Sequence, residues 1–346
     1  MLICGMQNLI LPALRPALPA ADFDRLALAL LRHQAGVNPV YKRFLAAKNL
    51  HPPDLPHWSA FPALPVQAFR NHTVTCFPAS EATLCFETSG TTSTRTGRHY
   101  LASPACYETA LYAAFRQFLP DLSQHRWIML VPPFAERPQS SLAYMLDYLA
   151  RQIPATPAHW LCPADYELDP EALAHCLNLD TVRPVALFGT SFALAQCAEF
   201  FQTTARHWSL PADSLVFDTG GYKGRHRELS RPEFCSLLQE IWAIPPGLIY
   251  NEYGMTELSS QGYADLSEGI HRFPDWVRVR VVNPDSTEAC RSGESGLVQI
   301  YDLANVGSVM AVETLDAAVQ EKNGIRLLGR ISNSEPRGCS LPYEIS

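Results

Sequence analysis

Two stretches of the sequence carry side chains that could do chemistry, and the first is Phe86–Arg98, FETSGTTSTRTGR. Its hydroxyls, its two arginines and the backbone N–H groups that a turn at Gly90 would free all favour a multiply charged anion such as a triphosphate. The Walker pattern is absent, because six residues separate Gly90 from Gly97 and no Lys-Ser/Thr pair follows. A plain loop that leaves a strand would also be rich in Ser, Thr and Gly. The stretch therefore predicts either such a loop or a phosphate site of another kind.

The second stretch is Ile249–Leu258, IYNEYGMTEL. It reads as the end of an apolar strand, then an aromatic residue, a glycine turn, a hydroxyl and a carboxylate. This order places Tyr253, Thr256 and Glu257 along one edge of a sheet. In open α/β sheets, ligands bind at the edge where the strands have their carboxyl ends. The stretch therefore predicts a ligand site at that edge.

An α/β framework is predicted to position these residues. Short apolar runs alternate with helical patterns along the chain, which favours a sheet with largely parallel pairing. The apolar runs are 126–131, 184–188, 214–217 and 247–250, and the helical patterns are 140–151, 192–203 and 230–242.

The two ends of the chain have a different texture. Helices are predicted from Asp22 and from Asn38. After Tyr263, an alternating run at 277–282, a turn at 283–286 and an apolar run at 297–301 predict a small antiparallel β subdomain. We therefore expect four parts: a helical lead (1–60), an α/β core (61–263), a β-rich subdomain of that core (264–328) and a short tail (329–346).

Composition excludes several classes of protein. A chain of 346 residues with 47% hydrophobic content can bury a large core. The net charge of -7 is interspersed and no basic stripe is present, which argues against a nucleic-acid partner. The N-terminal apolar run has no basic leader and is broken by Pro12, Pro16 and Pro19. The ten cysteines form no CxxC pair. We therefore expect a cytoplasmic protein in a reducing compartment, without a membrane partner.

TSGTT at 88–92 and YGMTE at 253–257, together and in this order, resemble the adenylate-forming enzymes, which activate a carboxylate with ATP as an acyl-adenylate. The resemblance implies a loop over the β- and γ-phosphates of ATP, formed by Thr88, Ser89, Gly90, Thr91 and Thr92. It also implies ATP and Mg²⁺ as cofactors, with Tyr253 on the adenine at the Gly254 turn, Thr256 at the α-phosphate and Glu257 on Mg²⁺. The chemistry agrees, since Mg²⁺ prefers one or two carboxylates plus phosphate oxygens and an aromatic ring stacks on a base.

Further segments narrow the resemblance to the acyl-protein synthetases of bacterial bioluminescence, with phenylacetate-CoA ligases as more distant relatives. It runs from about residue 38 to the end and rests on LPVQAF (64–69), ERPQSSLAY (136–144), FGTS (188–191), DTGGYKG (218–224), YDLAN (301–305), GRI (329–331) and RGCS (337–340).

This narrower resemblance implies further site residues. Gly220 and Gly221 would border the adenine, although a plain strand-to-helix turn is an equal alternative. Asp316 would grip the ribose hydroxyls, and Asp302 competes for that role. Arg330 would lie near the ribose beside a hinge, although the same local sequence would also fit an exposed arginine that forms an ion pair. Lys223 is expected to be solvated.

The C-terminus departs from the usual adenylate-forming pattern. Only 16 residues follow Arg330, too few for the mobile domain that delivers a catalytic lysine in those enzymes. In the bioluminescence branch, which shares the shortening, a cysteine near the C-terminus accepts the acyl group as a thioester. Cys339 lies where that cysteine is expected, with Arg337 to favour the thiolate and Gly338 to let the tail move. A bystander thiol on a frayed terminus is the alternative.

The sequence thus predicts ATP-dependent activation of a carboxylic acid, fatty or aromatic, followed by acyl transfer to a thiol. The acceptor would be Cys339, a partner protein such as a reductase or carrier, or coenzyme A. A shortened acyl-CoA ligase and a non-catalytic nucleotide-binding module stay open. A serine hydrolase or acyltransferase is a third alternative, because Ser191 follows a strand and opens a helix, although Ala193 stands where a nucleophile elbow has glycine.

Overall fold

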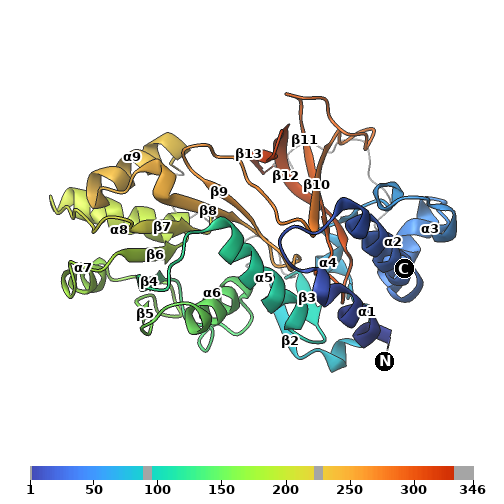
Figure 1. Ribbon diagram of the computed structural model, residues 1–346, viewed down its shortest axis with the longest axis horizontal. Coiled ribbons are helices and arrows are strands. Elements are labelled where there is room, and N and C mark those ends of the chain that lie inside the picture. Colours follow the sequence, from blue (N-terminus) through green and yellow to red (C-terminus); the bar gives the residue numbers. More distant parts are fainter. Residues whose placement is uncertain (1, 89–95, 222–228, 331–346) are drawn as a thin grey trace.

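The computed structural model describes residues 2–88, 96–221 and 229–330 (Figure 1). Several residues predicted to act in the site lie outside these ranges. They are Ser89, Gly90, Thr91, Thr92, Lys223 and Cys339.

A six-stranded sheet forms the larger part of the fold. Its strands lie in the order β5-β4-β6-β7-β8-β9, and all neighbours pair in parallel except β8 and β9. The strands are β4 (Arg126–Leu130), β5 (His159–Trp160), β6 (Val185–Gly189), β7 (Leu215–Asp218), β8 (Ile249–Tyr253) and β9 (Gly262–Asp265). The predicted α/β class with mainly parallel pairing is confirmed. The strand predicted at 247–250 instead begins at Ile249 and continues to Tyr253.

Helices cover both faces of this sheet. On β6, Ala186 and Phe188 pack toward α5 (Ala105–Phe118) and α6 (Ser141–Gln152), whereas Val185 and Leu187 pack toward the opposite layer. That layer consists of α7 (Pro170–Asn178), α8 (Ser191–Thr203) and α9 (Arg231–Trp242) (Figure 1). Because strands buried on both faces need apolar residues at every position, they are visible in the sequence as continuous apolar runs.

Side-chain caps fix several helix starts. Asn38 accepts hydrogen bonds from the backbone N–H groups of Val40 and Tyr41, and so begins α3 (Pro39–Ala47) where the sequence predicted it. Ser140 caps α6, and Ser230 forms a capping box with Glu233 at the start of α9. The remaining helices are α1 (Leu2–Ile10), α2 (Ala20–Val37) and α4 (Ala68–Asn71).

A second sheet contains five strands in the order β1-β12-β11-β10, with β13 also paired to β12. They are β1 (Leu64–Pro65), β10 (Val277–Val282), β11 (Ser295–Asp302), β12 (Ala311–Glu321) and β13 (Gly324–Arg330). All pairs are antiparallel except that of β1 with β12. The β10–β11 pair matches the sequence prediction, whereas β12 and β13 were not predicted.

A two-stranded hairpin of β2 (Leu84–Glu87) and β3 (Arg98–Leu101) flanks the loop rich in Ser and Thr. Glu87 pairs with Arg98 at the loop end of this hairpin. The described residues on either side of the loop are therefore held at a fixed separation by strand pairing.

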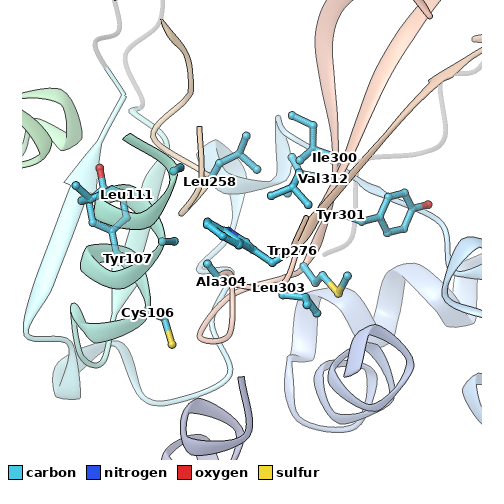
Figure 2. Packing of buried hydrophobic residues seen from close by; sticks show 14 of the residues in the cluster. Cys106, Tyr107, Leu111, Leu258, Trp276, Ile300, Tyr301, Leu303, Ala304 and Val312 are labelled. Atoms are coloured by element: carbon cyan, nitrogen blue, oxygen red, sulfur yellow. The ribbon is translucent and has the colours of Figure 1, made fainter. Parts of the chain in front are cut away.

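The fully buried side chain of Trp276 lies between α5 and the second sheet. Figure 2 shows it with Leu111 of α5 on one side and Ile300 and Val312 on the other. Its indole N–H donates to Ser260 Oγ at 2.9 Å, which ties it to the turn after β8. A buried aromatic residue of this kind contributes about 3–5 kcal/mol against truncation. Trp276 therefore helps to hold the two sheets together.

No helix in the described ranges has the length and apolar character needed to cross a bilayer.

Candidate active site

The carboxyl ends of β6, β7 and β8 bring several of the predicted residues to one edge of the large sheet. Gly189, Asp218 and Asn251 are neighbours in register across these strands. Each strand is followed at once by a predicted segment: the start of α8, the Gly220–Gly221 turn and the turn after Tyr253. Ligands of open α/β sheets bind at this edge.

The two glycines after β7 both adopt the left-handed conformation. Their φ angles are +69° for Gly220 and +84° for Gly221, which glycine adopts without strain. Among the described residues, a Cβ at either position would meet no atom within 4 Å, so no described residue covers this stretch of backbone on that side. The Gly220 N–H donates to Asp218 Oδ1 at 2.9 Å, which anchors the turn to the strand.

Three predicted nucleotide-binding residues meet on the second-sheet side of β8. The Tyr253 hydroxyl donates to Asp316 Oδ2 at 2.8 Å, and Arg330 Nε donates to Asp316 Oδ1 at 3.4 Å. Asp316 and Arg330 are register partners in β12 and β13. Burial, and then the Asp316 charge, raises the pKa of Tyr253 far above its usual range. The side chain of Arg330 is 71% exposed, so it can move without a large loss of packing.

Glu257 lies against the base of the loop rich in Ser and Thr. Thr88 N–H donates to Gly97 O and Gly97 N–H donates to Thr88 Oγ1, both at 2.9 Å, which closes the loop at its base. A Cβ on Gly97 would lie 3.3 Å from Glu257 Oε1 and 3.4 Å from Arg70 Cγ. The predicted metal-binding carboxylate and the predicted phosphate loop are therefore neighbours, and the sequence reasoning missed Arg70 beside them.

The electrostatics of Glu257 suit a cation. Burial raises the pKa of its carboxyl to about 7, while the charges of Arg70 and Arg330 act in the opposite direction. A buried carboxylate with an elevated pKa gains stability when a cation arrives. Among the described residues no three His, Cys, Asp or Glu side chains form a cluster of metal ligands. Mg²⁺ needs only one or two carboxylates when phosphate oxygens complete its shell, and Glu257 fits that requirement.

His99 ties the hairpin that flanks the loop to the Thr256 backbone, and sequence reasoning missed it. Its ring is fully buried, with Nδ1 2.8 Å from Thr256 O and Nε2 3.2 Å from Ser308 Oγ. Burial lowers the pKa of His99 to about 4, so the ring is neutral near pH 7. Because a carbonyl oxygen only accepts, Nδ1 carries the proton and Nε2 accepts from Ser308. A single histidine gives no signal of this role in the sequence.

The competing aspartate, Asp302, serves a different purpose. Its carboxyl is fully buried and accepts hydrogen bonds from Ser259 N, Ser260 Oγ and Ala304 N. Asn305 nearby donates to the carbonyl oxygen of Glu257 at 2.9 Å. Asp302 therefore holds the turn after β8, and Asp316 is the carboxylate beside Tyr253.

Ser191, the candidate nucleophile of a hydrolase, is buried at the start of α8. Its hydroxyl donates to Asp218 Oδ1 at 2.7 Å, and within the described ranges no histidine ring bonds to it. Activation of a serine needs a base within hydrogen-bond reach. This geometry gives Ser191 the function of satisfying a buried carboxylate.

Solved structures share this fold. The chain is similar to 2-hydroxyisobutyryl-CoA ligase in complex with an acyl-AMP, with a TM-score of 0.68 and 16% identity, over 92% of this chain and 69% of that one. It is also similar to ATP-bound MatB from Rhodopseudomonas palustris, with a TM-score of 0.52 and 14% identity, over 73% of this chain and 49% of that one. The architecture is thus that of adenylate-forming ligase cores over most of the chain.

The family model described as "Acyl-protein synthetase, LuxE" matches residues 163–344. This stretch is more than half of the chain, and the chain belongs to that family. A long-chain-fatty-acid–luciferin-component ligase of Vibrio harveyi is 25% identical over 187 residues. The match covers 51% of this chain and 49% of the ligase, so it spans about half the length of that relative. The family resemblance predicted from the motifs is confirmed.

We predict that His99→Leu lowers the free energy of unfolding by roughly 2–4 kcal/mol, because it leaves Thr256 O and the Ser308 hydroxyl unpaired. His99→Asn should recover part of this loss, since its amide can still donate to Thr256 O. Urea unfolding of both variants and wild type measures the difference.

The same bonds predict a pH dependence. The folded-state pKa of about 4 lies below the ordinary histidine pKa of 6.5, so between these pH values the unfolded chain binds a proton that the folded chain does not. Wild type should lose about 2 kcal/mol of stability from this group as the pH falls from 6.5 to about 5. The cost of His99→Leu should therefore be smaller at about pH 5 than at about pH 7. An equal cost at both pH values would contradict a buried neutral ring.

Proposed function

We propose that this protein activates a carboxylic acid with MgATP as an acyl-adenylate and then transfers the acyl group to a thiol. In the first step a carboxylate oxygen attacks the α-phosphorus, the bond to the β-phosphate oxygen breaks, and pyrophosphate leaves. In the second step a thiolate attacks the acyl carbon, the bond to the AMP oxygen breaks, and AMP leaves with that electron pair. The observation that carries the proposal is the meeting of Glu257 with the base of the Ser/Thr-rich loop, on a fold shared with adenylate-forming ligases.

Each residue has a proposed task in this reaction. Mg²⁺ on Glu257 would neutralise charge on the phosphates during adenylation. Thr88 and residues 89–92 would hold the β- and γ-phosphates, and Thr256 the α-phosphate. The aromatic ring of Tyr253, with Gly254 and the open backbone at Gly220 and Gly221, would border the adenine. Asp316 and Arg330 would contact the ribose.

Ligand-free contacts agree with this assignment of the ribose site. The Asp316 carboxylate already accepts two hydrogen bonds, from Tyr253 and Arg330. A ribose offers two hydroxyl donors, so a nucleotide could replace one or both of these bonds without leaving the carboxylate unpaired. Arg330 is mostly exposed and is the partner more easily displaced.

The acyl acceptor is proposed to be Cys339, which would pass the acyl group to a partner protein such as a reductase or carrier. The nine other cysteines are free thiols, and five of them are buried. Burial raises the pKa of Cys76 to about 12 and that of Cys162 to about 11, which disfavours the nucleophilic thiolate.

We also propose the division into parts 1–60, 61–263, 264–328 and 329–346, with the last as a vestigial C-terminal tail.

The acid is proposed to be a fatty acid, because the Vibrio harveyi relative is named for long-chain fatty acids. A shortened acyl-CoA ligase is the second candidate, favoured by the similarity to 2-hydroxyisobutyryl-CoA ligase in fold. The two candidates differ in the acceptor thiol and share the adenylation step.

Adenylation predicts that Glu257→Gln slows pyrophosphate release by about 100-fold or more, since losing charge stabilisation of a transferring phosphoryl group costs about 3 kcal/mol. The melting temperature should stay near that of wild type, because the amide keeps the shape of the side chain. Glu321→Gln is the matched control, as Glu321 pairs with Arg326 at the far end of the β12–β13 hairpin. A Glu257→Gln variant as fast as wild type would remove Glu257 from the reaction.

Acyl transfer predicts that Cys339→Ser keeps ATP–pyrophosphate exchange but loses the hydroxylamine-sensitive acyl label that wild type acquires from MgATP and radiolabelled acid. The reason is that the anhydride forms without the thiol, whereas the thioester requires it. Cys290→Ser is the matched control, because Cys290 is a partly buried free thiol in the segment between β10 and β11. Equal labelling of the Cys339→Ser variant would identify another acceptor. Formation of acyl-coenzyme A without any protein label would favour the shortened ligase.

A further inference from the structure

Glu252 lies directly before Tyr253 on β8, so its side chain points to the opposite face of the strand. Its side chain is 9% exposed, and its carboxyl oxygen Oε1 occupies the space that a Cβ on Gly254 would need. Gly254 itself is exposed. Glu252 is therefore held beneath the turn that carries Thr256 and Glu257, on the side away from Asp316.

The neighbours of Glu252 are polar groups from three elements. Asp218 lies on the adjacent strand β7, Tyr263 is the register partner of Glu252 on β9, and Tyr107 comes from α5. Burial, and then the Asp218 charge, raises the pKa of Glu252 to about 8. Burial, and then the Glu252 charge, raises the pKa of both tyrosines.

Two buried polar atoms beside Glu252 have no hydrogen-bond partner among the residues that the structure describes. They are the Tyr263 hydroxyl and Gln261 Oε1, in side chains that are 3% and 4% exposed. Gln261 also packs against Gly254, as Glu252 does. We call Glu252, Gln261 and Tyr263 the polar cluster.

Two other buried carboxylates near the same strand ends are paired within the fold. Asp302 accepts from three donors and Asp218 from Ser191, Gly220 and Asn251. An unpaired buried polar group lowers the free energy of unfolding by about 1–3 kcal/mol, so the unpaired atoms of the polar cluster destabilise the fold. A ligand that supplies the missing hydrogen-bond partner offsets this destabilisation.

The surroundings of the polar cluster suit the body of an acid. Tyr263 lies 5.6 Å from Phe118 and 6.2 Å from Phe217 between ring centroids, and Phe86 packs on Tyr107 at 5.4 Å. Apolar walls with a few placed polar groups are typical of small-molecule sites. The nearby edge of the sheet is open at Gly220 and Gly221.

We propose that the polar cluster binds a hydrogen-bond donor on the substrate acid, a hydroxyl or an ammonium group, and that Glu252 is a specificity-determining residue. This inference rests on the proposed adenylation of an acid at the Thr256–Glu257 turn. The donor bonds to Gln261 Oε1 and the Glu252 carboxyl, while the Tyr263 hydroxyl pairs with the same substituent. Among the fatty acids proposed above, a chain that carries such a donor is therefore favoured over an unsubstituted chain, which leaves these groups unpaired.

ATP–pyrophosphate exchange with matched acids tests the proposal. The acids are hexanoate, decanoate and phenylacetate, each beside its terminal or para hydroxy and amino derivatives. Wild type should prefer one donor-bearing form over its parent by about 100-fold in kcat/KM, because sites built to hydrogen-bond a substituent strongly reject analogues that lack it. The hydroxy and amino arms show which donor is bound.

Two variants separate recognition from folding. Glu252→Gln should reduce the preference, taken as the ratio of kcat/KM for the donor-bearing acid to that for its parent, by about tenfold or more. Tyr263→Phe removes a hydroxyl that lacks a partner among the described residues, so it should melt at or above the wild-type temperature and still lose part of the preference. Glu321→Gln is the control for loss of a carboxylate elsewhere.

Failure of the inference differs from failure of the proposed function. Active exchange without preference for a donor-bearing acid, or a preference that Glu252→Gln leaves unchanged, overturns the polar cluster and leaves adenylation standing. If no acid supports exchange, the rise in melting temperature with each acid alone decides. A rise that only donor-bearing acids produce, and that Glu252→Gln abolishes, supports the polar cluster. The same rise with parent acids overturns it.

Discussion

The turn that joins β8 to β9 is buried for much of its length and has no regular structure, so its backbone polar groups must be satisfied by side chains. Those side chains come from distant parts of the chain. His99 donates to Thr256 O, Asn305 donates to Glu257 O, and Asp302 accepts from Ser259 N. The candidate active site depends on these three bonds, because they fix the backbone from which the side chains of Thr256 and Glu257 extend.

This constraint links parts of the fold that are separate in sequence. His99 belongs to the hairpin that flanks the loop rich in Ser and Thr, so the loop and the turn are held together. Asp302 is the last residue of β11 and Asn305 follows it, which brings the second sheet to the same turn. Trp276 lies between α5 and the second sheet (Figure 2), and its indole N–H donates to Ser260 Oγ of this turn. A buried carboxylate at Glu257 is tolerated because its backbone is fixed and its charge has Arg70 nearby.

Local signals made much of the framework predictable from the sequence. The central strands are buried on both faces and appear as apolar runs, and caps such as Asn38 and Ser230 mark helix starts. The strands β12 and β13 carry mixed residues, because much of each is only partly buried, and were not predicted. The choice between Asp302 and Asp316 depends on partners brought by tertiary pairing, as do the roles of His99 and Arg70. No local pattern in the sequence reports such contacts.

The two faces of β8 would bind different substrates in the proposed reaction, the nucleotide on one face and the acid on the other. Successive side chains of a strand point to opposite sides, so Tyr253 meets Asp316 of the second sheet while Glu252 meets Tyr107 and Tyr263. A nucleotide on the first side and an acid on the second would approach each other only at the end of the strand. Gly254 permits this, because any larger residue there would displace the Glu252 carboxyl. On the proposed function, the strand end, with Thr256 and Glu257 just beyond it, is therefore the place where a carboxylate and an α-phosphate would meet.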